Sequence, residues 1–197
     1  MVAVGRGDDR RMGKVLEKID EDLAAFIVKQ PMFFVATAPS GPDGHVNVSP
    51  KGMRGTFAVL GEHRVAYLDW IGSGAETIAH LRDNGRITIM FCAFEGPPNI
   101  VRLHGQGRYV RAEEPRFAAA AAPFDLPDTV GLRGVVTVEV DRVSDSCGFS
   151  VPYMSYEGDR DLLVSYWDHR DTGYADDYRV RKNTTSIDGL PALGAVT

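Results

Sequence analysis

The sequence contains few of the residues that crosslink a chain or hold a metal. It has only two cysteines in 197 residues, Cys92 and Cys147, and they stand far apart and outside any Cys-x-x-Cys pattern. A disulfide scaffold and a zinc ribbon are therefore not indicated. The histidines show no spacing typical of zinc ligands, so we expect no metal site.

Long apolar runs and an excess of positive charge are also missing. The longest uncharged stretch, residues 30–42, is interrupted by three prolines and a glycine, and it is too short to cross a bilayer. Residues 1–14 have no apolar run behind their arginines, so we expect no signal peptide. The 22 Lys and Arg against 27 Asp and Glu leave a charge of −5, which argues against nucleic-acid binding. A cytoplasmic protein without membrane or nucleic-acid partners is expected.

The composition that remains is that of an ordinary globular protein. Hydrophobic residues make up 44% and charged residues 25% of the chain. At about 150 residues per domain, the length favours one domain. We expect a single domain over residues 1–197, with an N-terminal helix at 14–30, a core at about 31–145, and a C-terminal helix and tail at 146–197.

Hydrophobic periodicity predicts mostly strands. A helical pattern over residues 14–29 ends at Pro31, and shorter helices are predicted at 75–83, 113–122 and 159–169. Strands are predicted at 33–37, 45–49, 56–60, 64–70, 86–94, 100–110 and 135–143, with Gly105 and Gly107 indicating a bulge or a close approach. Six or seven strands joined mainly by short turns predict a mainly β fold, an antiparallel barrel with peripheral helices.

The first candidate site is the segment Gly72–Thr77, which lies between a predicted strand and a predicted helix. Unpaired N–H groups at the start of a helix attract a phosphate, and Ser73 and Thr77 can add hydroxyl groups. The alternative is an ordinary helix cap by one of these two side chains. Gly72-x-Gly74 also imitates a dinucleotide fingerprint, but Thr77 stands at the third glycine and hairpins dominate the chain.

The second candidate is the strand end around Pro50. Alternation places Val48 on one face and Asn47 and Ser49 on the other. Because Pro50 cannot donate a ladder hydrogen bond, the sheet opens there, which frees backbone groups to bind a flat polar ring. The alternatives are a solvated edge with Lys51 at the surface, or a Ser49–Lys51 hydrolytic dyad, for which no oxyanion partner is found.

The third candidate is the strand that follows Asn99. Arg102 and His104 point the same way, and the guanidinium can grip a phosphate or carboxylate. The alternative is the exposed face of an edge strand. Nothing near Cys147 marks it as a nucleophile, and the sequence identifies no general acid or base.

Six segments in this order carry a resemblance to a known family. They are FFVAT at 33–37, VNVSPKG at 46–52, AYLDW at 66–70, GSGAET at 72–77, RITIMF at 86–91 and RLHG at 102–105. Together they resemble the pyridoxamine 5′-phosphate oxidase-like, FMN-binding split-barrel family from about residue 33 to 143. The later segments CGFSVP at 147–152 and SIDGLP at 186–191 look like an uncharacterised subgroup.

The resemblance implies a six-stranded antiparallel Greek-key split barrel that forms a homodimer with two FMN molecules at the subunit interface. Backbone groups of Val48 and Ser49 would meet the polar edge of the flavin ring, with Lys51 nearby. The loop 69–77 would hold the phosphate, and the strand around 99–102 would approach from the other subunit. The cofactor-binding residues implied are Asn47, Val48, Ser49, Lys51, Asp69, Ser73, Gly74, Ala75, Thr77, Asn99 and Arg102.

Two departures from the family limit what the resemblance implies. Gly74 and Ala75 stand where the family often carries Arg-Lys, so the phosphate would rest on backbone N–H groups and on Lys51 or Arg102. The C-terminal Arg-Leu-His-x-Arg element that helps bind the vitamin substrate is absent. We therefore expect an FMN-dependent oxidoreductase of an unidentified small molecule. An F420-dependent reductase, or a flavin- or heme-binding module without turnover, remains an alternative.

Overall fold

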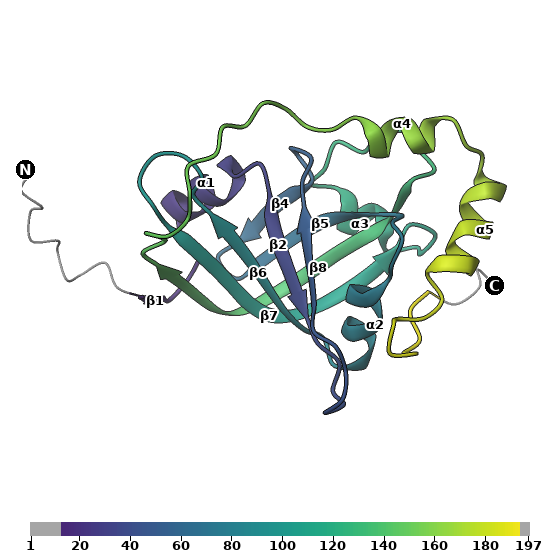
Figure 1. Ribbon diagram of the computed structural model, residues 1–197, viewed down its shortest axis with the longest axis horizontal. Coiled ribbons are helices and arrows are strands. Elements are labelled where there is room, and N and C mark those ends of the chain that lie inside the picture. The colour runs from purple at the N-terminus through teal and green to yellow at the C-terminus, as the bar shows by residue number, and fades with distance from the viewer. Residues whose placement is uncertain (1–12, 194–197) are drawn as a thin grey trace, which may run out of the picture.

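The computed structural model describes residues 13–193 (Figure 1). Most of residues 1–14, where no signal peptide is expected, and the end of the C-terminal tail lie outside this range. No helix in the described part of the chain is long and apolar enough to cross a membrane. The elements are β1 (Val15–Leu16), α1 (Glu21–Lys29), β2 (Phe33–Thr37), β3 (Asn47–Lys51), β4 (Phe57–Gly61), β5 (Arg64–Trp70), α2 (Glu76–Asp83), β6 (Arg86–Cys92), β7 (Ile100–Arg111), α3 (Phe117–Ala121), β8 (Leu132–Ser146), α4 (Leu162–Asp168) and α5 (Thr172–Lys182).

The strands form one antiparallel sheet in the order β3-β2-β6-β7-β8-β5-β4, with β1 paired to β8. β3 and β4 are the two ends of this path and do not pair with each other, so the curled sheet stays open between them. The predicted mainly β, antiparallel split barrel is confirmed. The count of six strands is wrong, because the path has seven and β1 adds an eighth. A two-residue strand such as β1 is too short to leave a periodic signal.

The core fills the inside of the curled sheet. Val35, Ile89, Leu103 and Val136 come from four different strands and are fully buried, as period-two alternation requires. α1 packs its buried Ile27 into the same cluster. In Figure 1, α1 lies at one end of the barrel and α2 toward the other, while α4 and α5 run along the outside.

Helix boundaries are where the sequence-based prediction is weakest. The helix predicted from residue 14 begins at Glu21, because residues 15–16 pair with β8 and the Asp20 side chain accepts a hydrogen bond from Leu23 N at 2.9 Å. The helix predicted at 113–122 is shorter in the structure, where α3 spans only Phe117–Ala121. The prediction missed α5 entirely, since its sequence is polar and buries only Ala175.

Gly105 marks a close approach between β7 and β8, as predicted. The register of the two strands shifts between His104 and Gly105. A Cβ at Gly105 would lie 2.0 Å from the backbone oxygen of Glu139. A Cβ at Gly107 would instead meet the side chain of Leu81, at 2.7 Å. The strands can therefore adopt this register only with glycine at 105.

A segment without helix or strand, Gly148–Asp161, crosses one end of the barrel from β8 toward α4 (Figure 1). We call it the strap. Two hydrogen bonds tie it to the barrel: Met154 N donates to Phe94 O at 3.1 Å, and Arg54 N donates to the Asp159 carboxylate at 3.0 Å. The Arg54 guanidinium also lies 4.3 Å from the centre of the Tyr156 ring.

Candidate functional site

The open edge of β3 carries unpaired backbone groups. β3 pairs only with β2, and Pro50 stands opposite Phe34. Because Pro50 has no N–H, this pair is a non-hydrogen-bonded one, so the backbones of Val48 and Pro50 point away from β2. The adjacent Ser49 backbone faces β2. Of the two residues expected to offer backbone groups to a ring, only Val48 presents them at the edge.

The inward side chains of β3 meet α2 across the gap in the sheet. Asn47 Nδ2 donates to Thr77 Oγ1 and to Ser49 Oγ, each at 3.2 Å. It also lies 3.4 Å from Thr37 Oγ1, which forms a buried 2.9 Å hydrogen bond with His80 Nδ1. The structure thus brings three predicted site residues together. Sequence reasoning missed Thr37 and His80, although Thr37 alternates with buried residues on β2.

A buried ion pair lies beside Lys51. Arg133 Nε donates to Asp69 Oδ2 at 2.8 Å, and Arg133 Nη1 donates to the carbonyl of Gly74 at 2.9 Å. Lys51 Nζ lies 3.6 Å from Asp69 Oδ1, with 26% of its side chain exposed. Burial by itself would raise the pKa of Asp69, but the charges of Arg133 and Lys51 outweigh it and hold the pKa below its ordinary value. Arg133 was not identified from the sequence, because it is 64 positions from its partner.

This arrangement disfavours the hydrolytic dyad. Lys51 Nζ faces Asp69, while the Ser49 hydroxyl donates to Asn47 Oδ1 at 3.3 Å. A lysine that activates a serine must lie within hydrogen-bond reach of its hydroxyl, and no such bond joins Ser49 and Lys51 in the described structure.

At the start of α2, no side chain caps the helix. The alternative of a plain cap by Ser73 or Thr77 is therefore wrong: Ser73 is exposed and Thr77 is buried against Asn47. The turn at residues 186–189 packs over the start of α2, where Ile187 N donates to Glu76 Oε2 at 3.0 Å. Glu76 Oε1 would lie 3.2 Å from a Cβ placed on Gly74. The helix start thus combines N–H groups that no side chain caps with a neighbouring carboxylate. Ala75, the residue just before α2, is buried.

Asn99 and Arg102 lie away from this site within one chain. β7, which carries Arg102, is separated from β3 by β6 and β2. Arg102 Nη1 donates to Ser146 Oγ at 3.0 Å, and His104 on the same outer face forms a 3.0 Å hydrogen bond with Thr88. Burial, together with the positive charge of Arg142, lowers the pKa of His104. The shared outward direction of Arg102 and His104 is as predicted.

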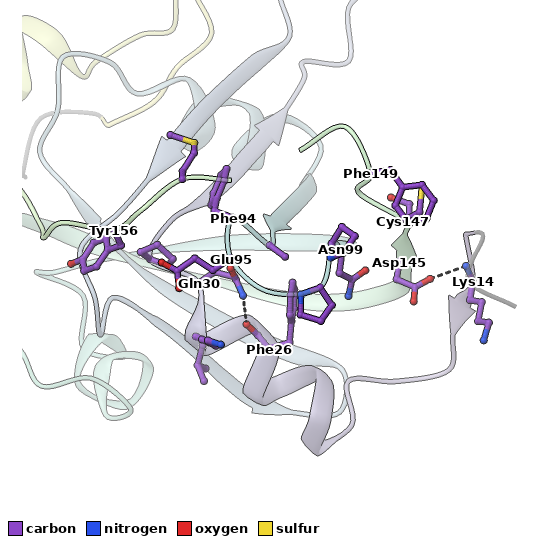
Figure 2. Close-up of a pocket in the computed structure, with 18 of the residues that line it drawn as sticks. Lys14, Phe26, Gln30, Phe94, Glu95, Asn99, Asp145, Cys147, Phe149 and Tyr156 are labelled. Carbon is purple, nitrogen blue, oxygen red and sulfur yellow. Dashed lines mark hydrogen bonds between the residues drawn. The ribbon is translucent and has the colours of Figure 1, made fainter. Parts of the chain in front are cut away.

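Two cavities adjoin under the strap. One of about 570 Å³ lies between α1, the β6–β7 turn and the strap, and Figure 2 shows Asn99, Cys147 and Phe149 around one end of it and Tyr156 at the other. The second, of about 700 Å³, lies between residues 50–53, residues 70–72 and the strap, and Lys51 lines it. We call this second cavity the strap pocket. Phe94 and Tyr156 line both cavities.

Comparison with known proteins identifies relatives of most of the chain. Residues 19–147 match the pyridoxamine 5′-phosphate oxidase family. A pyridoxamine 5′-phosphate oxidase family protein of Aspergillus flavus, ustO, is 38% identical over 191 residues, covering 90% of this chain and 76% of the relative. The crystal structure of a HupZ variant from Group A Streptococcus shares the fold, with 22% identity and a TM-score of 0.50 over 64% of this chain and 98% of HupZ. The strap, α4 and α5 follow the last residue of the family match.

Proposed function

This chain belongs to the pyridoxamine 5′-phosphate oxidase family, and on that premise we propose that it binds a flavin, FMN, and acts as an oxidoreductase on a small molecule. The observation that carries the proposal is the open edge of β3, which ends at Lys51 beside the strap pocket. A bound flavin would supply the redox chemistry, and the chain would supply position and electrostatics.

The ring end of the site fits a flavin. Val48 offers one N–H and one C=O at the open edge, which suit the alternating acceptors and donors of the ring's pyrimidine side. Asp69, Arg133 and Lys51 together carry one net positive charge, and Lys51 is the member that reaches the surface. A cation there would stabilise negative charge on a reduced ring. Beside this edge, Trp70 and Met53 line the strap pocket.

The phosphate end fits less completely. The N–H groups at the start of α2 favour an anion, and no side chain caps them. The Glu76 carboxylate lies beside Gly74 and would repel the negative charge of a phosphate bound there. Gly74 and Ala75 have no cationic side chain that would offset the charge of Glu76. Phosphate recognition by this chain would therefore rest on the backbone, against the charge of Glu76.

We expect FMN to bind at least about tenfold more tightly than riboflavin, which corresponds to ~1.4 kcal/mol from backbone contacts to the phosphate. Glu76→Gln should strengthen FMN binding by roughly threefold to tenfold, because it removes a like charge, and leave riboflavin unchanged. Quenching of flavin fluorescence measures both affinities. Glu139→Gln, at an exposed pair with Arg64, is the control. Equal affinity of the unmodified protein for both flavins would remove α2 from the phosphate site.

The identity of the cofactor is tested on protein purified from cells. Denaturation releases a noncovalent ligand, and absorption and mass spectra distinguish FMN, a deazaflavin and heme. FMN supports the proposal, whereas a deazaflavin or heme would replace it with one of the alternatives. Reduction of the bound flavin by a donor, faster than that of free FMN, would separate an oxidoreductase from a binding module.

We also propose that the site is completed in a homodimer. Val48 is 61% exposed on the outer face of β3, and Val46, just before β3, is 70% exposed. Phe34 on β2 and Met90 on β6 are half-buried. An apolar face of this kind marks an interaction site. A second copy docked there would lie along the open edge of β3, where Arg102 or Asn99 of that copy could approach a flavin.

A charge on this face should break the dimer. We expect Val48→Asp to shift the protein from dimer to monomer in light scattering, because an interface core excludes an unpaired carboxylate. Val180→Asp on α5, a position 55% exposed, should leave the dimer intact. A stable monomer of the unmodified protein that binds flavin fully would contradict the shared site.

A further inference from the structure

The strap pocket has the size and lining of a small-molecule site. Its volume of about 700 Å³ lies within the range of ~300–1,000 Å³ usual for such sites. Most of the residues around it are apolar, and the barrel contributes Met53, Leu68, Trp70 and Phe94 while the strap contributes Met154. Methionine side chains are flexible and adapt to ligands of different shape.

The charged groups around the pocket balance one another. Two of the lining side chains, Lys51 and Arg160, are basic, and two, Glu157 and Asp159, are acidic. Glu157, Asp159 and Arg160 lie on the exposed strap. No excess of positive charge is therefore available to hold an anion such as a phosphate ester, and the acidic groups on the strap disfavour one.

The strap presents more apolar surface than its own packing requires. Met154 is 55% exposed and Leu162, at the start of α4, is 67% exposed, although both line the pocket. Apolar side chains that gather at the rim of a cavity and remain accessible are typical of a ligand site. This side of the pocket is built by residues after the family match, so it lies outside the part of the barrel that the match covers.

From these observations we propose that the strap pocket binds the substrate, and that this substrate is an uncharged, largely apolar molecule. This proposal rests on the proposed function, because the pocket would hold the substrate next to a flavin at Lys51. The strap would select the substrate by apolar contact, whereas the barrel would hold the cofactor.

The test uses Nile red, an uncharged dye that fluoresces in apolar sites, titrated into the full chain. We expect one site with blue-shifted emission. Met154→Glu and Leu162→Glu should weaken dye binding at least tenfold, because each adds a charge to the apolar rim of the pocket. Both positions are exposed, so the fold should tolerate them. Val180→Glu on α5 is the matched control, and its affinity for Nile red should stay within twofold of that of the unmodified protein.

Displacement of the dye then tests the class of ligand. Uncharged 2-naphthol should displace Nile red at least tenfold more effectively than 2-naphthyl phosphate, and riboflavin should not displace it. More effective displacement by the phosphate, dye binding unaffected by both rim variants, or competition by riboflavin would each overturn the proposal. Dye binding with the expected pattern in a protein that binds no flavin would refute the proposed cofactor and leave the apolar site standing.

Discussion

Arg133→Met is expected to lower the free energy of unfolding by about 3–5 kcal/mol, because it strands a buried carboxylate. Asp69 and Arg133 have only 4% and 5% of their side chains exposed, and they are joined at 2.8 Å. Methionine preserves much of the side-chain volume but removes the charge and the hydrogen bond to the Gly74 carbonyl. Lys51, at 3.6 Å from Asp69, cannot replace the lost partner fully.

Urea denaturation with two controls separates the buried charge from other effects. Asp69→Asn combined with Arg133→Met should recover much of the loss, since no charge is left unpaired. Arg64→Met removes a pair at 2.7 Å with Glu139 whose side chains are both 59% exposed, and it should cost no more than ~1 kcal/mol. A loss below ~1 kcal/mol for Arg133→Met would show that Asp69 is not held as an ion in the folded protein.

The dependence on pH follows from the same pair. The folded-state pKa of Asp69 lies below its ordinary value of 3.8, so the unfolded chain binds the proton more tightly than the folded protein does. The stability that this pair contributes is therefore present above pH 3.8 and is lost as the pH falls through the folded-state pKa. The difference between the unmodified protein and Arg133→Met should shrink over that range.

Gly105→Ala is expected to destabilise the protein by about 3 kcal/mol or more, since overpacking against atoms that cannot move is costly. The added Cβ would lie 2.0 Å from the Glu139 backbone oxygen and 3.0 Å from Val140 Cα, and both belong to β8. The paired strands would have to separate at the bulge where their register shifts.

Gly107→Ala is the matched control two residues along the same strand. There the Cβ would meet Leu81 Cδ2, the end of a side chain that can rotate, at 2.7 Å. A cost of about 1 kcal/mol or less is expected. Equal losses of unfolding free energy for the two variants, measured by urea denaturation, would contradict the backbone contact as the cause.

Local pattern was enough to predict most of the sheet. β2 and β5 have the predicted bounds. β2 alternates between buried and half-buried residues, whereas β5 is a short, almost continuously buried run, and both patterns are typical of strands. The prediction failed where burial is sparse or an element is short. α5 buries only Ala175, and β1 has two residues, so neither leaves an apolar period in the sequence.

Within the candidate site, the sequence identified Asn47, Ser49 and Lys51 near a strand end and Thr77 at a helix start, and the family resemblance added Asp69. It could not identify their partners, because hydrogen bonding and ion pairing depend on distance in space and not along the chain.

By itself, the sequence determined an antiparallel barrel, the facing of Asn47, Val48 and Ser49 on one strand and of Arg102 and His104 on another, and the resemblance to a family, since these follow from short-range alternation and ordered motifs. Only the tertiary structure decided that Arg133 neutralises Asp69 from 64 positions away, that Glu76 stands beside Gly74, and that the strap closes an apolar pocket over Lys51. Such contacts form only when the curled sheet brings distant segments together, and no local pattern of residues encodes them.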